Sequence, residues 1–390
     1  MLLSVDLPGT VRDALLAPLV DHHCHGVRRD DLTRAQFELL VNEGGGASPP
    51  GTTHFDTPFG LALRRWCAPL LDLEPHAPPA VYLARRAELG AAEVNRRLLA
   101  AAGVVAFLVD TAPVDVNAEE TDLLSAAEMG RHGGAAADEL VRIERIEQDV
   151  AEQAQVAVDY LDSLGEELTA RAARAVGLKT VVAALCGLDF DPARPSRGSV
   201  IAAANRRLAA PKEPLTDPVL LRYLLWSTID VAKERGLPVQ FHTGLGGGCG
   251  PGLDLHRTDP ARLSAFVAAL QPTGVPVILL HCYPFHRQAA YLAGRYPHVY
   301  VDVGLALPHT AAASARVMEE LLELAPFHKQ LFSSGCRGVA ESCLLGALYY
   351  RQALGTALAA RIGAGEWNAA DAARITHMIG SGNARRIYRL

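Results

Sequence analysis

The sequence predicts a (β/α)8 barrel, because eight short apolar segments alternate with amphipathic helical segments along most of the 390 residues. Near-continuous apolar strands are typical of a parallel sheet that is covered by helices. Eight such units suit a closed barrel better than an open sheet. The predicted strands are 19–25, 104–110, 140–147, 176–185, 239–244, 277–282, 299–304 and 330–335.

The first predicted strand ends in two histidines one residue apart, His23 and His25. Side chains two positions apart in a strand point to the same face, about 7 Å apart at about 3.3 Å per residue. Two neutral imidazoles on one strand supply half of a tetrahedral zinc shell. A His-x-His pair alone is weak evidence in a chain with fourteen histidines, so the interpretation depends on the motifs further along the chain.

Residues 28–103 separate the first two strands and are predicted to form a helical insertion within a single domain that spans 1–390. Helical spacing recurs at Leu61–Leu73 and Ala91–Ala101, between loops rich in glycine and proline. We expect this insertion to cover the site as a lid or to shape specificity, with additional helical packing as the alternative. A C-terminal helical segment is expected over 368–390.

Helix boundaries are clearest between the later strands. Asp217 and Pro218 provide an N-cap and a first-turn proline, and Gly236 ends the same apolar-faced segment. Asp259 and Pro260 begin another helix in the same way.

Two further predicted strands end in histidine, at His242 and His281, and the strand around 177–181 carries Lys179. Taken singly, a histidine at a strand end is more often a hydrogen-bonded core residue, and a lysine usually reaches solvent. In a barrel, however, functional groups gather at the C-terminal ends of the strands. Four histidines at the ends of three strands therefore predict a shared metal site.

The net charge and the composition of the sequence limit the classes of binding partner. A net charge of −6 gives no basic field for nucleic acid or anionic lipid, so neither partner is expected. The N-terminus lacks a cationic segment and no run of eighteen apolar residues occurs, which predicts a cytoplasmic protein with a small-molecule substrate. The seven cysteines show no disulfide spacing. A homo-oligomer is left open.

Several motifs together resemble the amidohydrolase superfamily, specifically the amidohydrolase-related family 2 branch that includes the amidohydrolase-like domain of nodulin and FluG-type proteins. The resemblance implies a metal-dependent barrel that usually hydrolyses C–N bonds, with relatives that decarboxylate or hydrate. The motifs are Asp21-His22-His23-Cys24-His25, Gly177-Leu178-Lys179-Thr180, Phe241-His242-Thr243-Gly244, Leu280-His281-Cys282-Tyr283-Pro284, Val299-Tyr300-Val301-Asp302-Val303-Gly304 and Leu331-Phe332-Ser333-Ser334.

The resemblance assigns roles to individual residues. His23, His25 and His242 become metal ligands, and His281 becomes either a ligand of a second metal or the group that polarises the substrate carbonyl and shuttles protons. Lys179 stands where some relatives carry a carbamylated lysine that bridges two metals. The expected cofactor is Zn²⁺, one ion with two as the alternative, and Mn²⁺ or Fe²⁺ as other candidates.

Two further residues are assigned to substrate binding, Arg287 and Glu341. Arg287 follows the sixth strand closely, and Glu341 falls where the family has a glutamate. Each also has an ordinary explanation as a residue at the start of a helix.

The sequence departs from the family at Gly335, where relatives carry an aspartate at the end of the eighth strand that binds metal and takes a proton from water. General-base help alone is worth about 10²- to 10⁴-fold in rate. The glycine is either a substitution made to stall turnover, a natural change compensated by another group such as Cys336, or the mark of a non-hydrolytic relative.

The resemblance implies a hydrolase that cleaves a C–N bond of a small molecule with metal-activated water. By resemblance to proteins in which this domain is fused to a glutamine synthetase-like domain, the expected substrate is a γ-glutamyl amide or a similar small amide. A metal-dependent decarboxylase or lyase is the first alternative. A non-catalytic binding protein that keeps the barrel is the second.

Overall fold

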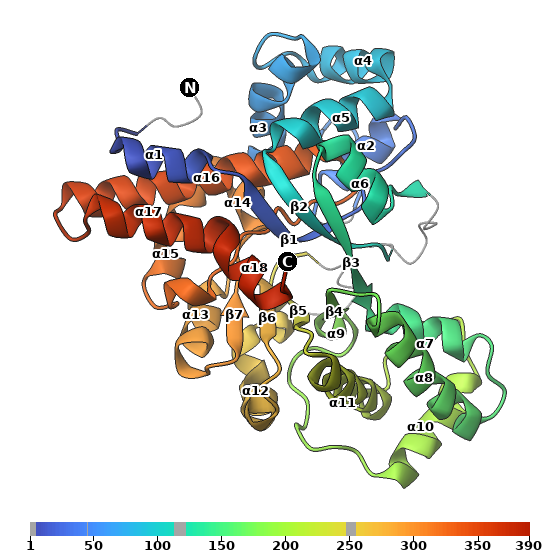
Figure 1. The fold of residues 1–390 in the computed structure, drawn as a ribbon. Helices are drawn as coiled ribbons and strands as arrows, with labels where there is room; N and C mark the ends of the chain where they lie inside the picture. The colour runs from blue at the N-terminus through green and yellow to red at the C-terminus, as the bar shows by residue number, and fades with distance from the viewer. Residues whose placement is uncertain (1–4, 45, 113–121, 247–254) are drawn as a thin grey trace. The chain divides into compact units, whose positions relative to one another are not determined.

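A computed structural model describes residues 5–44, 46–112, 122–246 and 255–390 (Figure 1). The chain divides within strand β3 into two compact units, the first made of 1–138 with 302–390 and the second of 139–301. No helix within the described ranges is long and apolar enough to cross a membrane.

The first unit contains two strands and most of the helices that flank them in sequence. Its elements are α1 (Gly9–Leu16), β1 (Leu19–His25), α2 (Arg34–Leu40), α3 (Pro58–Trp66), η1 (Ala68–Leu71), α4 (Pro79–Leu89), α5 (Ala91–Ala101), β2 (Val104–Asp110), α6 (Ala126–Gly133), α14 (Ala306–Thr310), η6 (Ala311–Ala313), α15 (Ser314–Leu322), η7 (Phe327–Lys329), α16 (Ala340–Gly363), α17 (Ala369–His377), η8 (Met378–Gly382) and α18 (Asn383–Tyr388).

Strands β1 and β2 are parallel neighbours in this unit, and every residue of β1 is buried. The register is regular at the strand's end, where His25 lies opposite Asp110, but shifts between Asp21 and Cys24. Such an irregularity re-aims side chains locally and is common beside functional sites.

The predicted eighth strand is present as an extended segment, 330–336, although the structure assigns it no strand. Its backbone pairs with β1: the His22 amide donates to Phe332 O at 3.2 Å, and the His25 amide donates to Cys336 O at 2.7 Å. The described residues therefore contain seven strands, and a closed eight-stranded barrel stays a prediction.

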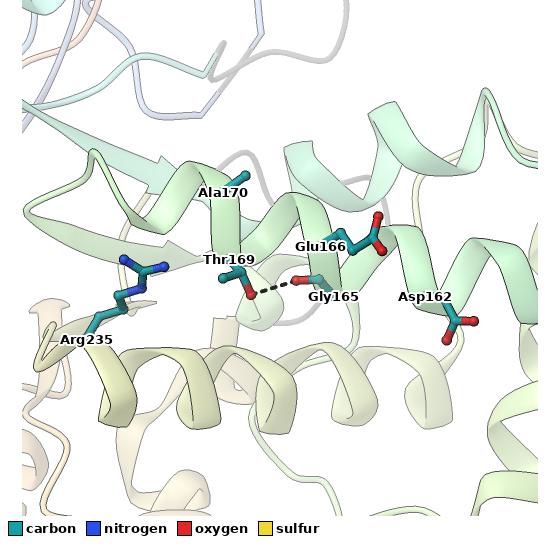
Figure 2. A pocket seen from close by; sticks show the side chains of 6 residues that line it. All are labelled: Asp162, Gly165, Glu166, Thr169, Ala170 and Arg235. Carbon is teal, nitrogen blue, oxygen red and sulfur yellow. Dashed lines mark hydrogen bonds between the residues drawn. The ribbon is translucent and has the colours of Figure 1, made fainter.

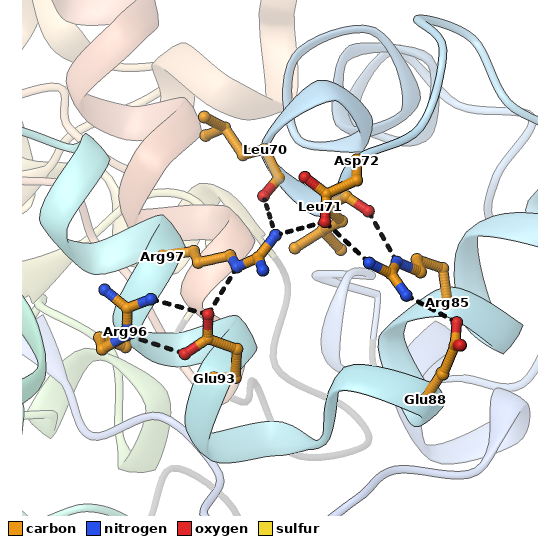
Figure 3. Close-up of polar contacts among 8 residues, drawn as sticks. All are labelled: Leu70, Leu71, Asp72, Arg85, Glu88, Glu93, Arg96 and Arg97. Atoms are coloured by element: carbon orange, nitrogen blue, oxygen red, sulfur yellow. Dashed lines mark hydrogen bonds and ion pairs between the residues drawn. The ribbon is translucent and has the colours of Figure 1, made fainter.

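Helices dominate the region predicted as an insertion, since α2, α3, α4 and α5 all fall within 28–103. A surface network of alternating charges ties this region together (Figure 3). Asp72 accepts hydrogen bonds from Arg85 at 2.7 Å and Arg97 at 2.8 Å, and Glu93 accepts from Arg96 and Arg97. The C-terminal segment is helical as predicted, with α17 and α18 joined by a π-helical turn.

The second unit carries a parallel sheet in the order β3-β4-β5-β6-β7, with helices between the strands. Its elements are β3 (Ala136–Arg142), α7 (Ile143–Ala151), α8 (Ala157–Ala172), β4 (Gly177–Thr180), α9 (Val182–Leu185), α10 (Arg197–Leu208), α11 (Pro218–Arg235), β5 (Val239–Thr243), η3 (Leu255–Thr258), η4 (Pro260–Leu263), α12 (Ser264–Leu270), η5 (Gln271–Thr273), β6 (Val277–His281), α13 (His286–Arg295) and β7 (Val299–Val301).

The helix boundaries predicted by capping residues are confirmed, because Asp217 accepts from two amides of the first turn of α11 and Gly236 ends it in the left-handed conformation. Two predicted strand ends were wrong. The strands predicted over 140–147 and 176–185 stop at Arg142 and Thr180, and helices α7 and α9 begin almost at once. A short apolar run such as Val182–Leu185 fits a buried helix as well as a strand, so its periodicity could not separate the two.

Candidate functional site

The first unit brings His23 and His25 together at the end of β1. Their ring centroids are 5.1 Å apart and the rings lie nearly perpendicular, at 87°. Both side chains are buried, with His23 fully enclosed and His25 7% exposed. The pair that the sequence predicts is therefore preformed on one strand, which lowers the ordering cost of binding an ion.

Asp110 is a site residue that the sequence analysis did not identify. It ends β2, lies opposite His25 in the register, and places Oδ2 3.8 Å from His25 Nδ1. A histidine that binds metal commonly uses its other ring nitrogen toward a carboxylate, which fixes the ring's orientation. Asp110 is fully buried and suits that role toward His25. The sequence pattern that could have indicated Asp110 is an apolar strand, 104–109, that ends in an aspartate.

Gly335 occupies a position where the backbone itself favours glycine. Its φ of +60° is left-handed, and a Cβ there would lie 2.8 Å from Leu305 Cβ and 2.9 Å from Leu305 Cα. A side chain at 335 would thus meet both strain and a clash with backbone. This geometry argues against the explanation that an aspartate was replaced to stall turnover.

One serine of the extended segment, Ser334, is held by Asp21 of β1. Ser334 donates its amide to Asp21 Oδ1 at 2.9 Å, and its hydroxyl donates to Asp21 Oδ2. Burial raises the pKa of Asp21 from 3.8 to about 6, against the lowering effect of the hydrogen bonds from Ser334. Both oxygens of the Asp21 carboxyl therefore bond to Ser334, the residue before Gly335.

Glu341, predicted to bind substrate, is fully buried in the first turn of α16. Its Oε1 accepts hydrogen bonds from Arg86 Nε and from the Tyr82 hydroxyl, each at 2.9 Å. Both donors come from α4, so this carboxylate fastens the insertion to α16. Its Oε2 is buried and has no hydrogen-bond partner among the described residues.

The second unit brings His242 and His281 together at the ends of neighbouring strands β5 and β6. The ring centroids are 4.8 Å apart at 61°, and both side chains are buried. His242 Nε2 lies 3.1 Å from the Leu245 carbonyl oxygen. This is a second preformed imidazole pair at the C-terminal edge of a parallel sheet.

The backbone at His281 is strained. His281 and Cys282 have φ values of +66° and +55°, which cost of order 1–3 kcal/mol each for residues other than glycine. The segment after β5 packs closely against this turn: the Leu245 amide donates to Tyr283 O at 2.6 Å, and a Cβ on Gly244 would lie 2.4 Å from the same oxygen. Strain of this kind clusters at functional sites.

The two cations predicted for this region differ in setting. Lys179 is 1% exposed in β4, between Arg142 of β3 and Gln240 of β5 in the sheet register. Arg287 is exposed in the first turn of α13, one residue after the buried His286.

Glu144, at the start of α7, is another residue that the sequence analysis missed. Its Oε1 accepts from the Val181 amide at 2.9 Å and from the Thr180 hydroxyl, directly after Lys179 in the chain. Burial raises the pKa of this carboxyl above 4.5. Glu144 therefore places a carboxylate at the same sheet edge as Lys179, without any recognisable sequence motif.

The donor chemistry in each unit suits a metal such as zinc. Each unit offers two buried imidazoles, which are preferred ligands of Zn²⁺ and its neighbours, and the first adds the carboxylate of Asp110. No group of three or more histidine, cysteine, aspartate or glutamate side chains poised to hold an ion occurs within the described part of the chain. Neither pair alone makes a complete ligand set among the described residues.

A separate hollow of about 670 Å³ lies between α8 and α11 on the second unit (Figure 2). The hollow is open to solvent. Two of its lining residues are hydrogen-bonded to each other within α8, where the Thr169 hydroxyl donates to Gly165 O at 2.8 Å. None of the predicted site residues lines it. Its lining residues are Asp162, Gly165, Glu166, Thr169, Ala170 and Arg235.

The fold is similar to that of several solved structures. A protein from Lactobacillus casei ATCC 334, described only provisionally as a metal-dependent hydrolase, superposes with a TM-score of 0.84 at 21% identity, covering 98% of each chain. Uronate isomerase from Thermotoga maritima follows with 0.66 at 12%, covering 97% of each, and glucuronate isomerase from Caulobacter crescentus with 0.66 at 16%, covering 100% of this chain and 96% of that one.

The chain belongs to the amidohydrolase family, whose model matches residues 20–390. It is also 29% identical over 228 residues to the FluG protein of Emericella nidulans. That match covers 55% of this chain and only 26% of the relative, so the chain spans about a quarter of the length of FluG. The match to the family model confirms the resemblance to amidohydrolases that the sequence motifs predicted.

Proposed function

We propose that this protein is a metal-dependent hydrolase that cleaves the C–N bond of a small amide, with one metal ion held by His23, His25 and His242. The observation that carries the proposal is the pairing of buried imidazoles at strand ends in each unit of an amidohydrolase-family chain. When bound, a zinc ion would polarise the scissile carbonyl and lower the pKa of a water toward neutrality.

The chain's own residues then divide the remaining tasks. The imidazole of His281 hydrogen-bonds to the carbonyl oxygen of the substrate and carries the proton from the attacking water to the leaving nitrogen. Water adds to the carbonyl carbon, the C–N bond breaks, and the leaving group departs as an amine or ammonia. Asp110, whose Oδ2 lies 3.8 Å from His25 Nδ1, is the carboxylate nearest to orienting that ring when His25 binds metal through its other nitrogen.

The proposed substrate class is argued from charge. Lys179 and Arg287 are cations of the second unit, and a substrate with a carboxylate suits them. A γ-glutamyl amide has both the carboxylate and the amide that this arrangement would take. Glu341 is less suited to substrate, because its Oε1 is already bonded to Arg86 and Tyr82.

The test is hydrolysis of a panel of γ-glutamyl amides and other small amides by protein reconstituted with Zn²⁺, with release of amine or ammonia measured. His281→Asn should reduce kcat by about 10²-fold or more, since it removes the proton carrier. His377→Asn, at an exposed position in α17, is the matched control and should behave as wild type. No turnover of any amide by metal-loaded wild type would contradict the proposal.

A second candidate is a metal-dependent decarboxylase or lyase. It is favoured by the single observation that Gly335 leaves no carboxylate at the position where hydrolytic relatives activate water. Release of CO₂ from small carboxylic acids, without amide hydrolysis, would support this second candidate.

A further inference from the structure

Four buried side chains form a continuous hydrogen-bonded relay that runs from the C-terminal helix through β1 to the extended segment. His22 Nε2 lies 2.7 Å from Asp302 Oδ2, and His22 Nδ1 lies 3.0 Å from the Tyr388 hydroxyl. The Ser333 hydroxyl donates to the same Asp302 oxygen at 3.1 Å. Tyr388 is 5% exposed and the other three are fully enclosed.

Asp302 is the common acceptor of the relay. It also accepts from the Gly304 amide at 3.0 Å, so its carboxylate accepts from the Ser333 hydroxyl, the Gly304 amide and a His22 Nε2–H. The other ring nitrogen of His22 bonds to the Tyr388 hydroxyl, so both ring nitrogens have a partner within the relay.

The relay contacts β1 where the strand's register is irregular. The register shifts between Asp21 and Cys24, and the relay bonds to the strand through the His22 side chain, directly before His23. On the other side, the Gly335 amide donates to His23 O at 3.3 Å. A strand that slipped by one residue here would turn its histidines to the opposite face.

Asp21 makes a second contact between β1 and the extended segment. Its carboxylate binds Ser334 while His22 reaches Ser333 through Asp302, so consecutive side chains of β1 fasten consecutive residues of the extended segment. The helix α18 near the C-terminus carries Tyr388, which bonds to His22 at the other end of the relay.

We propose that the Tyr388–His22–Asp302–Ser333 relay is a positioning device that holds the end of β1 so that His23 and His25 present a preformed ligand pair. The inference rests on the proposed metal site. It assigns the last residues of the chain a part in metal binding, although none of the four relay side chains is itself a ligand.

The test is the affinity of Tyr388→Phe for Zn²⁺, measured by competition with a chromogenic chelator, together with the visible spectrum of the Co²⁺-loaded protein. Loss of partners that orient ligands typically lowers metal affinity by 10- to 100-fold, and we expect a loss in that range with an altered Co²⁺ spectrum. Tyr160→Phe is the matched control, because its buried hydroxyl donates to Glu147 Oε1 at 2.8 Å in the second unit. Its metal affinity should equal that of wild type.

The outcomes separate the two proposals. Wild-type protein that binds no metal would overturn the proposed function, and this inference with it. Wild type that binds metal, with Tyr388→Phe unchanged in affinity and spectrum, would overturn the relay alone. Ser333→Ala, which removes the opposite end of the relay, provides the same comparison if Tyr388→Phe does not fold.

Discussion

At the scale of single residues, Gly335 shows how backbone geometry can decide an identity. The left-handed φ and the approach of Leu305 leave no room for a side chain, and both features lie within the first unit. Glycine at position 335 is therefore consistent with the local backbone structure.

Gly335→Asp should lower stability without raising the rate of hydrolysis. The combined cost of the left-handed conformation and the clash is about 2–4 kcal/mol, measurable by urea unfolding. Gly134→Asp is the matched control, because Gly134 has a φ of +65° but no atom within 4 Å of the place that a Cβ would take. A Gly335→Asp variant that is as stable as wild type and faster in hydrolysis would contradict this account.

Glu341 illustrates a residue whose buried partners argue for a structural role. Glu341→Gln removes one charge of a buried ion pair with Arg86 and should destabilise the protein by about 3–5 kcal/mol. Glu88→Gln, which breaks an exposed pair with Arg85, should change stability little. The comparison is made by chemical unfolding. A raised KM with unchanged stability in Glu341→Gln would instead support substrate binding.

At the scale of elements, α6 is anchored by a complete capping box. Ser125 accepts from the Glu128 amide, and Glu128 accepts from the Ser125 amide and from Arg29. The Ser125 amide contributes most to lowering the pKa of Glu128 from 4.5 to about 2. A carboxylate stabilised in this way joins the helix to the segment after β1.

The sign of the pH dependence follows from that shift. Because the pKa of Glu128 is lower in the folded state, its contribution is fully present above about pH 4.5 and is lost as the pH falls toward 2. Glu128→Gln should therefore flatten part of the decline in melting temperature over this window, relative to wild type. An identical decline in both proteins would show that Glu128 contributes nothing to acid stability.

Elements also mark the limit of what the sequence could predict. Capping residues located α11 correctly, since Asp217, Pro218 and Gly236 act locally. The ends of β3 and β4 were misplaced, because helices begin at once and the apolar run continues into them. Residues 330–335 were predicted as a strand, and the segment does pair with β1 while falling short of a regular strand.

At the scale of the whole molecule, the sequence predicted the family and the histidine motifs, which are carried by contiguous residues. It missed Asp110, Glu144 and the relay through His22, because these depend on contacts between segments distant in sequence. Asp302 and Tyr388 lie 280 and 366 residues from His22. No local pattern encodes such pairs.

The central claim is a metal ion held by His23, His25 and His242, and metal content tests it most directly. We predict about one zinc per chain in protein purified without chelator. We also predict its loss in His242→Asn and in the double variant His23→Asn/His25→Asn, with full retention in His377→Asn. Less than about 0.2 metal per chain in wild type, or equal metal content in all four proteins, would contradict the account.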